Sequence, residues 1–444
     1  MSQKQPNKLI VCDLCLSNEI HETINLGFLY GLSLISPKQE IIFFADQGHQ
    51  RVIKENINHK ALDLEALSYI SLPANLNSSI KGYLTSYLRI KSILDYQLQH
   101  KSEHLLVLSS VSFQRLILKT LLTLKKYQHI NCTFVMHGDL DDLVSIKHKD
   151  QEVAGTYFTH VANAQKTQEV AGTYSGTYSN LRKKLIHLCT PSIDFKKHLL
   201  TNHSPQVRYI VLAPHILDRL SDDLPHQSLG FYYLPHPAVF SASDQPIKVK
   251  HQTQKQKLKC AIFGYGNPPV LMQLNQILSN LWRLQNQSDD KQSTLEDALE
   301  IRIVGSNHQG AEFFPWVTSP ITHRALSRLE MEKLAADIDL FLILYEPHRY
   351  QLSCSGSIIE AFSYLKPVYH LTNPCIDGFN PKSSPIGKSF GHLEALAQAL
   401  IQLMNNPKQK EKELNHYKAN MLKVRPLLDI RHNLPKLKLA LGLS

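Results

Sequence analysis

IDLFLILYEPHRYQLSCSGSIIEAFSYLKPVYHLT, residues 338–372, is the stretch that decides the fold. Its opening apolar run is too short to favour a helix and is typical of a buried strand. Farther on, apolar residues recur at helical spacing until Pro367 ends the pattern. The predicted elements are a strand (Leu340–Leu344), a polar loop (345–354), a helix that starts near Ser355 and a second strand (Val368–Leu371). This order predicts one βαβ unit of a parallel sheet.

The loop of this unit lies at the carboxyl end of a strand, where open parallel sheets bind ligands. A helix that starts on Ser355-Gly356-Ser357 directs unbonded N–H groups and a positive dipole end toward that edge, which suits a phosphate. Glu360 lies one turn further, within reach of a sugar hydroxyl. The same spacing, Ser357-x-x-Glu360, also fits a capping box in which Glu360 only satisfies the helix start. Both interpretations stay open at this point.

The first part of the chain repeats short apolar runs between helical or polar segments. They are rich in Val, Ile, Phe and Tyr and nearly free of charge, as strands covered on both faces require. The predicted strands are Leu9–Leu14, Ile41–Ala45, Tyr69–Leu72, Leu105–Leu108, Thr133–Met136, Tyr209–Leu212 and Phe231–Leu234. Helical segments such as Lys81–His100 alternate with them, so residues 1–240 are predicted to form a Rossmann-like domain.

The same pattern restarts after a polar linker, residues 241–258. The predicted strands of the second half are Cys260–Gly264, Ile301–Gly305, Leu340–Leu344 and Val368–Leu371. A helix is predicted over Leu326–Ala336, with a capping box formed by Ser327 and Glu330. Residues 259–425 are therefore predicted to form a second Rossmann-like domain. Residues 426–444 form a charged helical tail that could pack back on the first domain.

One segment of the first half is duplicated. The sequence QEVAGTY occurs at 151–157 and again at 168–174, and its small and polar residues are typical of a surface loop. We expect residues 148–180 to form a mobile loop, and the sequence assigns it no function.

Composition restricts the class of protein. The chain has 444 residues, 43% of them hydrophobic, which is ordinary for two or three globular domains. A strand-like segment, 8–14, follows the first residues directly, and no apolar run approaches the ~20 residues of a membrane span. We therefore expect a cytoplasmic protein. The seven scattered cysteines fit buried thiols better than a metal or redox site.

The net charge of +10 raises the question of an anionic partner. No RNP, helix-turn-helix or zinc-finger pattern is present, so we expect no nucleic-acid partner. Basic residues are interleaved with leucines over 115–126 and 181–200, as in amphipathic helices that dock on anionic lipid. A solvated helix face explains them equally well. Peripheral contact with the inner face of a membrane stays open.

The motifs together resemble bacterial family-4-like (group 1) glycosyltransferases of surface polysaccharide synthesis. The matching segments are Phe263–Gly266 (FGYG), Ile303–Gly305 (IVG), Ser327–Asp339 (SRLEMEKLAADID), Tyr350–Ala361 (YQLSCSGSIIEA), Lys366–Val368 (KPV), His137-Gly138 and His236-Pro237. The segment from Tyr350 to Val368 is the specific one. This resemblance implies the GT-B fold, α/β, with two Rossmann-like domains facing a central cleft.

The resemblance also implies roles for particular residues. Glu360 would hold the nucleotide ribose, and the Ser355, Gly356 and Ser357 amides the diphosphate. Donor binding would further involve Gly264, Gly266, Tyr345 and Tyr350. The acceptor side would carry Asp13, His21 and Asn25, and the candidate catalytic residues are His137 and Asp139. No metal and no cofactor are expected beyond the nucleotide sugar, which is a substrate.

Two departures from the family pattern concern charge. Leu352 stands where the family often has a second Glu, and Glu346 is too far upstream to replace it automatically. Asn267-Pro268-Pro269 stands where an Arg and a Lys often neutralise the diphosphate. Arg302, Arg324 and Arg349 are the candidate substitutes, and the sequence does not choose among them.

The predicted function is transfer of a hexose from a nucleotide-diphosphate sugar to a saccharide or lipid-linked glycan. A metal-dependent GT-A transferase is disfavoured, although two Asp-x-Asp triplets exist, at 139–141 and 337–339. A nucleotide-sugar epimerase of GT-B shape and a non-catalytic glycan- or nucleotide-binding relative remain alternatives. The sequence leaves the donor sugar, the acceptor and the stereochemistry undecided.

Overall fold

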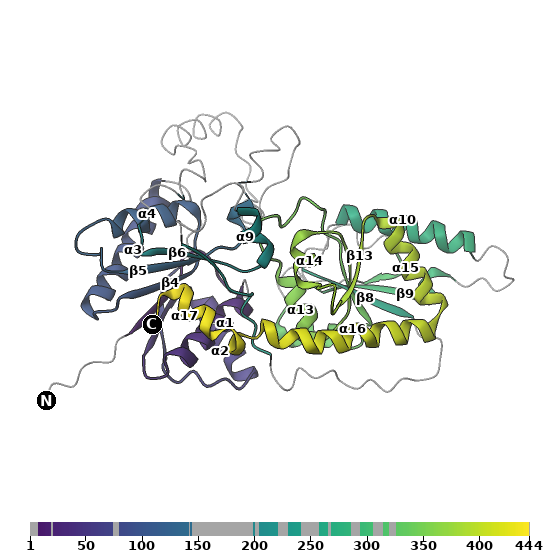
Figure 1. Ribbon diagram of the computed structural model, residues 1–444, viewed down its shortest axis with the longest axis horizontal. Coiled ribbons are helices and arrows are strands. Elements are labelled where there is room, and N and C mark those ends of the chain that lie inside the picture. The colour runs from purple at the N-terminus through teal and green to yellow at the C-terminus, as the bar shows by residue number, and fades with distance from the viewer. Residues whose placement is uncertain are drawn as a thin grey trace, which may run out of the picture. The chain divides into compact units, whose positions relative to one another are not determined.

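The computed structural model describes residues 8–18, 21–73, 80–141, 143, 199, 204–220, 230–240, 257–264, 268–285, 294–304, 314–318 and 326–443. The described chain is α/β, with two separate parallel sheets and helices packed on them (Figure 1). The duplicated QEVAGTY segment and the whole of 148–180 lie outside the described residues.

Contacts divide the chain into two compact units. The first comprises Met1–Val239, Gln351–Cys354 and Ile430–Ser444, and the second comprises Phe240–Tyr350 and Ser355–Asp429. Two segments distant in sequence therefore complete the first unit. One of them, Gln351–Cys354, is bonded there through Asp141, whose carboxylate accepts hydrogen bonds from Leu352 N (2.6 Å) and Ser353 Oγ (2.5 Å).

The first unit contains a seven-stranded sheet in which all neighbouring strands are parallel. The strands are β1 (Leu9–Asp13), β2 (Ile41–Ala45), β3 (Leu67–Ser71), β4 (His104–Ser109), β5 (Asn131–Val135), β6 (Val207–Val211) and β7 (Phe231–Tyr233). Their order is β3-β2-β1-β4-β5-β6-β7. All seven strands predicted from the apolar runs are confirmed, with ends that shift by at most two residues. Most of their side chains are buried, because helices cover both faces.

Helices of the first unit connect these strands. Those within the described residues are α1 (Glu22–Ile35), α2 (Gln47–His59), α3 (Ile80–Gln99), α4 (Ser112–Leu122), the 3-10 turn η1 (Asp139–Asp141) and α9 (Pro214–Leu220). The predicted helix over Lys81–His100 is confirmed as α3. Helix α1 packs very closely on the chain at Pro237, since a Cβ on Gly27 would lie 2.0 Å from the Pro237 carbonyl oxygen.

The end of the chain belongs to the first unit. The 3-10 turn η5 (Ile430–His432) and helix α17 (Leu434–Leu441), yellow in Figure 1, pack on α1, and α17 also contacts β5, β6 and β7. Ile430, Leu437 and Ala440 are buried in the apolar cluster of this unit. The turn at Ile430 is tied to the chain before the linker, because Ile430 N donates to the Ala238 carbonyl oxygen (2.9 Å).

The second unit contains a six-stranded sheet, also parallel throughout. Its strands are β8 (Leu258–Phe263), β9 (Leu299–Val304), β10 (Val317–Thr318), β11 (Leu340–Ile343), β12 (Val368–Leu371) and β13 (Gly387–Phe390), in the order β10-β9-β8-β11-β12-β13. The four predicted strands are confirmed as β8, β9, β11 and β12. The edge strands β10 and β13 were not predicted, because neither is an apolar run.

Helices of the second unit cover its sheet. They are α10 (Pro268–Gln285), α11 (Leu295–Ala298), α12 (Arg328–Ala335), α13 (Gly356–Tyr364), α14 (Pro374–Phe379), α15 (Leu393–Asn405) and α16 (Pro407–Leu428). The capping box predicted at Ser327 is confirmed, since Ser327 N donates to Glu330 Oε2 (2.8 Å) and Glu330 N to Ser327 Oγ (3.4 Å). Helix α13 ends before Pro367, as predicted, with Leu365 in the left-handed conformation after its last residue.

The basic segment 115–126 is only partly a surface. Arg115 and Lys119 on α4 are 1% and 0% exposed, and Lys119 Nζ donates to the Leu199 carbonyl oxygen (2.8 Å). These two cations therefore cannot contact lipid, whereas Lys125 and Lys126 of the same segment are exposed. Burial lowers the pKa of Lys119 to about 8. In the described part of the chain, no helix combines the length and apolarity of a membrane span.

Candidate functional site

The strand order of the second unit reverses between β8 and β11, and this reversal positions a site. Open parallel sheets bind ligands at such switch points, beyond the carboxyl ends of the strands. Gly264 follows β8 directly and adopts a positive φ of 69°, a conformation that favours glycine. Tyr345 follows β11, and helix α13 starts after the loop that Tyr345 opens.

Helix α13 is capped by Ser355. Its side chain accepts a hydrogen bond from Ser357 N (3.2 Å), and Ser355 N donates to Cys375 Sγ (3.3 Å). The alternative capping box, with Ser357 as the cap and Glu360 reaching back to it, is wrong, because the cap stands two residues earlier. Glu360 therefore has another role than the satisfaction of the helix start.

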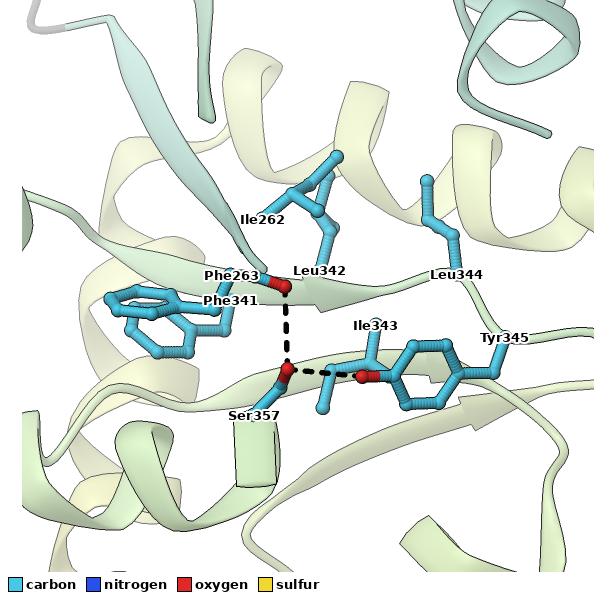
Figure 2. Close-up of a pocket in the computed structure, with 8 residues that line it drawn as sticks. All are labelled: Ile262, Phe263, Phe341, Leu342, Ile343, Leu344, Tyr345 and Ser357. Carbon is cyan, nitrogen blue, oxygen red and sulfur yellow. Dashed lines mark hydrogen bonds between the residues drawn. The ribbon is translucent and has the colours of Figure 1, made fainter. Parts of the chain in front are cut away.

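Hydroxyl groups join the start of α13 to the two central strands (Figure 2). Tyr345 Oη donates to Ser357 Oγ (3.0 Å), and Ser357 Oγ donates to the Phe263 carbonyl oxygen at the end of β8 (3.3 Å). Since Tyr345 has one proton, Ser355 Oγ donates to it in turn (2.8 Å). The predicted donor-side residues Tyr345, Ser355 and Ser357 thus form one chain of hydrogen bonds. Burial raises the pKa of Tyr345, so its hydroxyl stays neutral.

The cavity beside these hydrogen-bonded hydroxyl groups is too small for a nucleotide. Side chains of β8 and β11, together with Leu344, Tyr345 and Ser357, line it (Figure 2), and its volume of about 10 Å³ admits no more than one water. The space in front of the helix start is open, since nothing lies within 4 Å of the position that a Cβ on Gly356 would take. Among the described residues, the Gly356 side of the first turn of α13 is therefore open to a ligand.

Glu360 is paired with a residue that the sequence analysis did not select. Arg328 Nη1 contacts both Glu360 oxygens, at 2.8 and 2.7 Å, from the first position of α12. The signal that could have found Arg328 was the capping box at Ser327, which fixes where α12 begins. The Tyr350 ring lies beside the Tyr345 ring, with centroids 4.6 Å apart and planes tilted by 40°. Gly266 lies outside the described residues.

The three basic candidates for neutralising a diphosphate separate clearly. Arg302 is held by Glu300 (2.6 Å) and Asp337 (2.7 Å), which lie at the start of β9 and before the start of β11. Its ion pairs therefore lie toward the amino-terminal ends of the strands, away from the site at their carboxyl ends. Arg349 lies in the loop after β11, at the correct end, near Glu346 (3.9 Å). Arg324 lies outside the described residues.

The place of the missing family glutamate is apolar in this chain. Leu352 is buried, and its backbone N–H binds Asp141 within the first unit. Glu346 is half exposed in the second unit, and its carbonyl oxygen accepts from Asn373 Nδ2 (3.1 Å). Neither residue reproduces a second carboxylate beside Glu360.

The first unit has its own switch point, between β1 and β4, and three predicted acceptor-side residues gather there. Asp13 ends β1, and its Oδ1 accepts from the Cys15 (3.2 Å) and Leu16 (2.9 Å) amides. Its Oδ2 accepts from Asn25 Nδ2 (2.8 Å). Both oxygens of Asp13 are thus used by the protein, and its side chain is buried, so it orients the site rather than taking a proton from a ligand.

His21 and His137 meet at this edge with ring centroids 4.2 Å apart. His137 Nε2 donates to the Leu108 carbonyl oxygen (2.7 Å), so Nδ1 is the nitrogen that can accept a proton. Burial lowers the pKa of both imidazoles, which are therefore neutral near pH 7. His21 Nδ1 is buried and has no hydrogen-bond partner among the described residues. His21 directly precedes α1, and Asn25 lies in its first turn.

Two further histidines belong to this cluster, and the sequence analysis did not assign them a site role. His49 Nε2 accepts from Asn25 Nδ2 (2.8 Å), while its Nδ1 donates to the Asn18 carbonyl oxygen (2.7 Å). His236 is buried beside His137, and burial lowers its pKa to about 3. His236-Pro237 had been noticed only as a family motif; with 23 histidines in the chain, no local pattern separates these two from the others.

Asp139, the second candidate catalytic residue, is committed to an ion pair. Its carboxylate contacts Arg115 Nη2, and both side chains are buried. Arg115 also donates to the Ser110 carbonyl oxygen (2.6 Å) and to Ser112 Oγ (3.1 Å). The Asp139 carboxylate is engaged by Arg115 inside the protein, whereas Nδ1 of His137 can accept a proton, so the geometry favours His137 over Asp139. Asp141, the other end of the Asp-x-Asp triplet, accepts hydrogen bonds from residues 352 and 353. Among the described residues, no group of three or more His, Cys, Asp or Glu side chains could hold a metal ion.

Each of the two parallel sheets reverses its strand order once, and a helix starts on Ser-Gly-Ser at the reversal in the second sheet. These are features of the GT-B fold. Solved structures of this class match nearly the whole chain. A glycosyltransferase from Rickettsia africae has a TM-score of 0.57 and 12% identity, with 99% of this chain and 100% of that chain covered. HepE from Anabaena, in complex with UDP and glucose, has a TM-score of 0.55 and 10% identity, with 98% and 100% covered.

WaaG, a glycosyltransferase involved in lipopolysaccharide biosynthesis, has a TM-score of 0.51 and 11% identity, with 98% and 100% covered. At these identities the likeness establishes the fold alone, and it confirms the predicted GT-B class. It also removes the GT-A alternative. No protein-family model and no curated protein sequence matches the chain.

Proposed function

We propose that the protein is a glycosyltransferase that takes a hexose from a nucleotide-diphosphate sugar. The observation that carries the proposal is the start of α13, which lies at the switch point between β8 and β11 with Glu360 one turn behind it. The fold is compatible with several reactions, so the site carries the argument.

The donor would bind the second unit. The open side of Gly356 admits a diphosphate to the first turn of α13, where amide groups and the helix dipole favour negative charge. Glu360 would accept hydrogen bonds from the ribose. The HepE structure, which contains UDP, supports the choice of UDP as the first nucleotide to test.

The acceptor would bind the first unit. Its hydroxyl oxygen would form a bond to the anomeric carbon while the bond from that carbon to the diphosphate breaks, and the released acceptor proton would move to His137 Nδ1. His137 suits this role because it is neutral and because Leu108 fixes its tautomer. This assignment applies to an inverting enzyme; a retaining enzyme needs no such base.

The alternatives differ from transfer in the substrates that they need. An epimerase turns over the nucleotide sugar without an acceptor, and a binding protein turns over nothing. The residues that would hold the donor are the same in all three. Acceptor-dependent release of nucleoside diphosphate therefore identifies a transferase, and conversion of the nucleotide sugar to its epimer without acceptor identifies an epimerase. Binding of the nucleotide sugar with neither reaction identifies a binding protein.

A role in surface polysaccharide assembly, with a saccharide or lipid-linked acceptor, is part of the proposal, and the reported involvement of WaaG in lipopolysaccharide biosynthesis supports it. A cytoplasmic location and independence of metal stay predictions. For contact with anionic lipid, the supporting feature is now α3, where Leu84 and Leu88 are 59% and 55% exposed one turn apart. Co-sedimentation with anionic but not neutral vesicles, lost in Leu84→Ser, is the expected result.

Calorimetry tests the donor site. UDP, GDP, ADP and CMP are titrated with a chelator present into the wild type, Glu360→Gln and the control Glu346→Gln. We expect one diphosphate to bind, and Glu360→Gln to weaken it about tenfold or more, since hydrogen bonds to charged groups are worth about 1.5–3 kcal/mol. Glu346, half exposed in the loop after β11, should tolerate the change. Absence of binding by all four nucleotides would contradict the proposal.

A further inference from the structure

The four residues before the cap of α13 belong to the first unit, although the residues on both sides of them belong to the second. We call residues 351–354 the strap. Leu352 and Ser353 are buried, and Cys354 packs on the apolar cluster of the first unit. The strap ends directly before Ser355, which caps α13. The candidate phosphate-binding helix therefore starts directly after a segment that the first unit holds.

The residues at both ends of the strap are fixed by other contacts. Before it, Tyr350 adopts the left-handed conformation, with a φ of 54° that is uncommon for a residue other than glycine. Such a conformation persists where surrounding contacts determine it, and the Tyr350 ring lies beside the Tyr345 ring. After it, Ser355 N donates to Cys375 Sγ (3.3 Å). A change in the position of the strap would therefore be passed directly to Ser355.

Asp141 holds the strap in the first unit. It ends the 3-10 turn η1, and its carboxylate accepts from Leu352 N (2.6 Å) and Ser353 Oγ (2.5 Å). Burial raises the pKa of Asp141, and the hydrogen bonds from Ser353 and Leu352 oppose that rise. The strap thus stabilises the charge on Asp141, and Asp141 gives two buried polar groups of the strap their partner.

The turn that carries Asp141 follows the candidate base. Asp141 N donates to the Gly138 carbonyl oxygen (3.2 Å), and Gly138 is the next residue after His137. A short series of covalent and hydrogen bonds therefore leads from His137 through η1 and the strap to Ser355. If a ligand orders one end of this series by binding, order at the other end must favour that ligand by the same factor.

We propose that Asp141 is a positioning residue for the donor site: it holds the strap, so that the start of α13 is in place to receive a diphosphate. The inference rests on the proposed function, because it requires that a nucleotide bind at α13. It adds a link between nucleotide binding and the turn after His137. It also gives the second carboxylate of the Asp-x-Asp triplet a role other than metal binding.

Hydrogen–deuterium exchange over residues 350–357 tests whether Asp141 holds the strap. Wild type, Asp141→Asn and Ser353→Ala are compared without nucleotide. Ser68→Ala is the matched control, because Ser68 Oγ also donates to a carboxylate of the first unit, that of Glu40 (2.8 Å), far from the strap in sequence. We expect exchange in the strap to be about tenfold faster in both strap variants, the value of one hydrogen bond to a charged acceptor, and unchanged in the control.

The same exchange measurement with saturating UDP, or with whichever diphosphate binds, tests the positioning role. The nucleotide should slow exchange in the strap in the wild type and in Ser68→Ala, but not in Asp141→Asn. A purely structural contact would not respond to the nucleotide. By calorimetry, Asp141→Asn should bind the nucleotide about fivefold more weakly, since the coupling is reciprocal, and Ser353→Ala should show a smaller loss.

Unchanged exchange in the strap in both Asp141→Asn and Ser353→Ala overturns the inference. Faster exchange with wild-type nucleotide affinity also overturns it, because Asp141 then holds the strap without positioning the donor site. In both cases nucleotide binding by the wild type, and the proposed function, stand. If Asp141→Asn does not fold, wild-type affinity in Ser353→Ala overturns the inference. Absence of nucleotide binding by the wild type contradicts the proposed function itself, and the inference with it.

Discussion

The switch points of the two sheets have the same topology but differ in their electrostatics. In the first unit the edge between β1 and β4 collects His21, His137 and His236, which burial keeps neutral. In the second unit the edge between β8 and β11 presents a helix start and the charged pair of Arg328 and Glu360. The first arrangement suits the movement of a proton and the second suits an anion.

The difference shows how little the strand order decides about chemistry. Both sheets reverse their order beside the first strand of the unit, so both offer a crevice. What each crevice can do follows from the desolvation of its side chains. Burial removes the charge of the imidazoles in the first unit, whereas the second unit pairs a guanidinium with a carboxylate.

The largest expected effect is on catalysis. If His137 takes the acceptor proton, His137→Asn should lower turnover about 10²–10⁴-fold and leave nucleotide affinity unchanged. Steady-state release of the diphosphate, beside calorimetry, measures both. The exposed His348 is the control, changed to Asn. A loss below about tenfold would assign the first edge to binding and favour a retaining reaction.

The second prediction separates Asp139 from His137. Removing one partner of a buried ion pair typically costs about 3–5 kcal/mol, so Asp139→Asn should lower the free energy of unfolding by about that amount. Denaturant unfolding measures it. Joint replacement, Arg115→Met with Asp139→Leu, should recover part of the loss. A stable Asp139→Asn protein without activity would instead make Asp139 catalytic.

The third prediction concerns pH and has the smallest magnitude. The pKa of His236 is about 3 in the folded protein and 6.5 without burial, so the unfolded state binds more protons below pH 6.5. Stability is therefore retained above that pH and falls as the pH decreases toward the folded pKa. For His236 alone the loss is about 2 kcal/mol between pH about 7 and about 5.

Unfolding curves over that pH range measure the slope, and His236→Gln should flatten it, because Gln does not titrate. An equal slope in the variant would show that other groups, not this imidazole, carry the pH dependence. The comparison of the two edges would then lose its basis in the first unit.

Much of the fold was predictable because buried parallel strands are continuous apolar runs. Ile41–Ala45 and Val368–Leu371 were predicted to the residue. Strand β13, Gly387–Phe390, was not, since an edge strand needs only its backbone pairing and its sequence GKSF carries no apolar signal. The start of α12 followed from its capping box, a local hydrogen-bond pattern.

The candidate site was predictable only where one segment carries it. Ser355, Ser357 and Tyr345 are neighbours in sequence, and they form one chain of hydrogen bonds. Glu360 had two local interpretations, and the choice between them required Arg328, 32 residues away. The burial of Arg115 and Lys119 was not predictable for a related reason, because their partners come from distant parts of the first unit.

The sequence by itself determined the alternation of strands and helices, the two sheets and the helix start that suits a phosphate, since these depend on hydrophobic period and local hydrogen bonds. Only the tertiary structure decided which charges are neutralised and which remain available. Burial and ionic pairing depend on side chains brought together from distant segments, and these interactions set the chemistry of Asp139, His137 and Glu360.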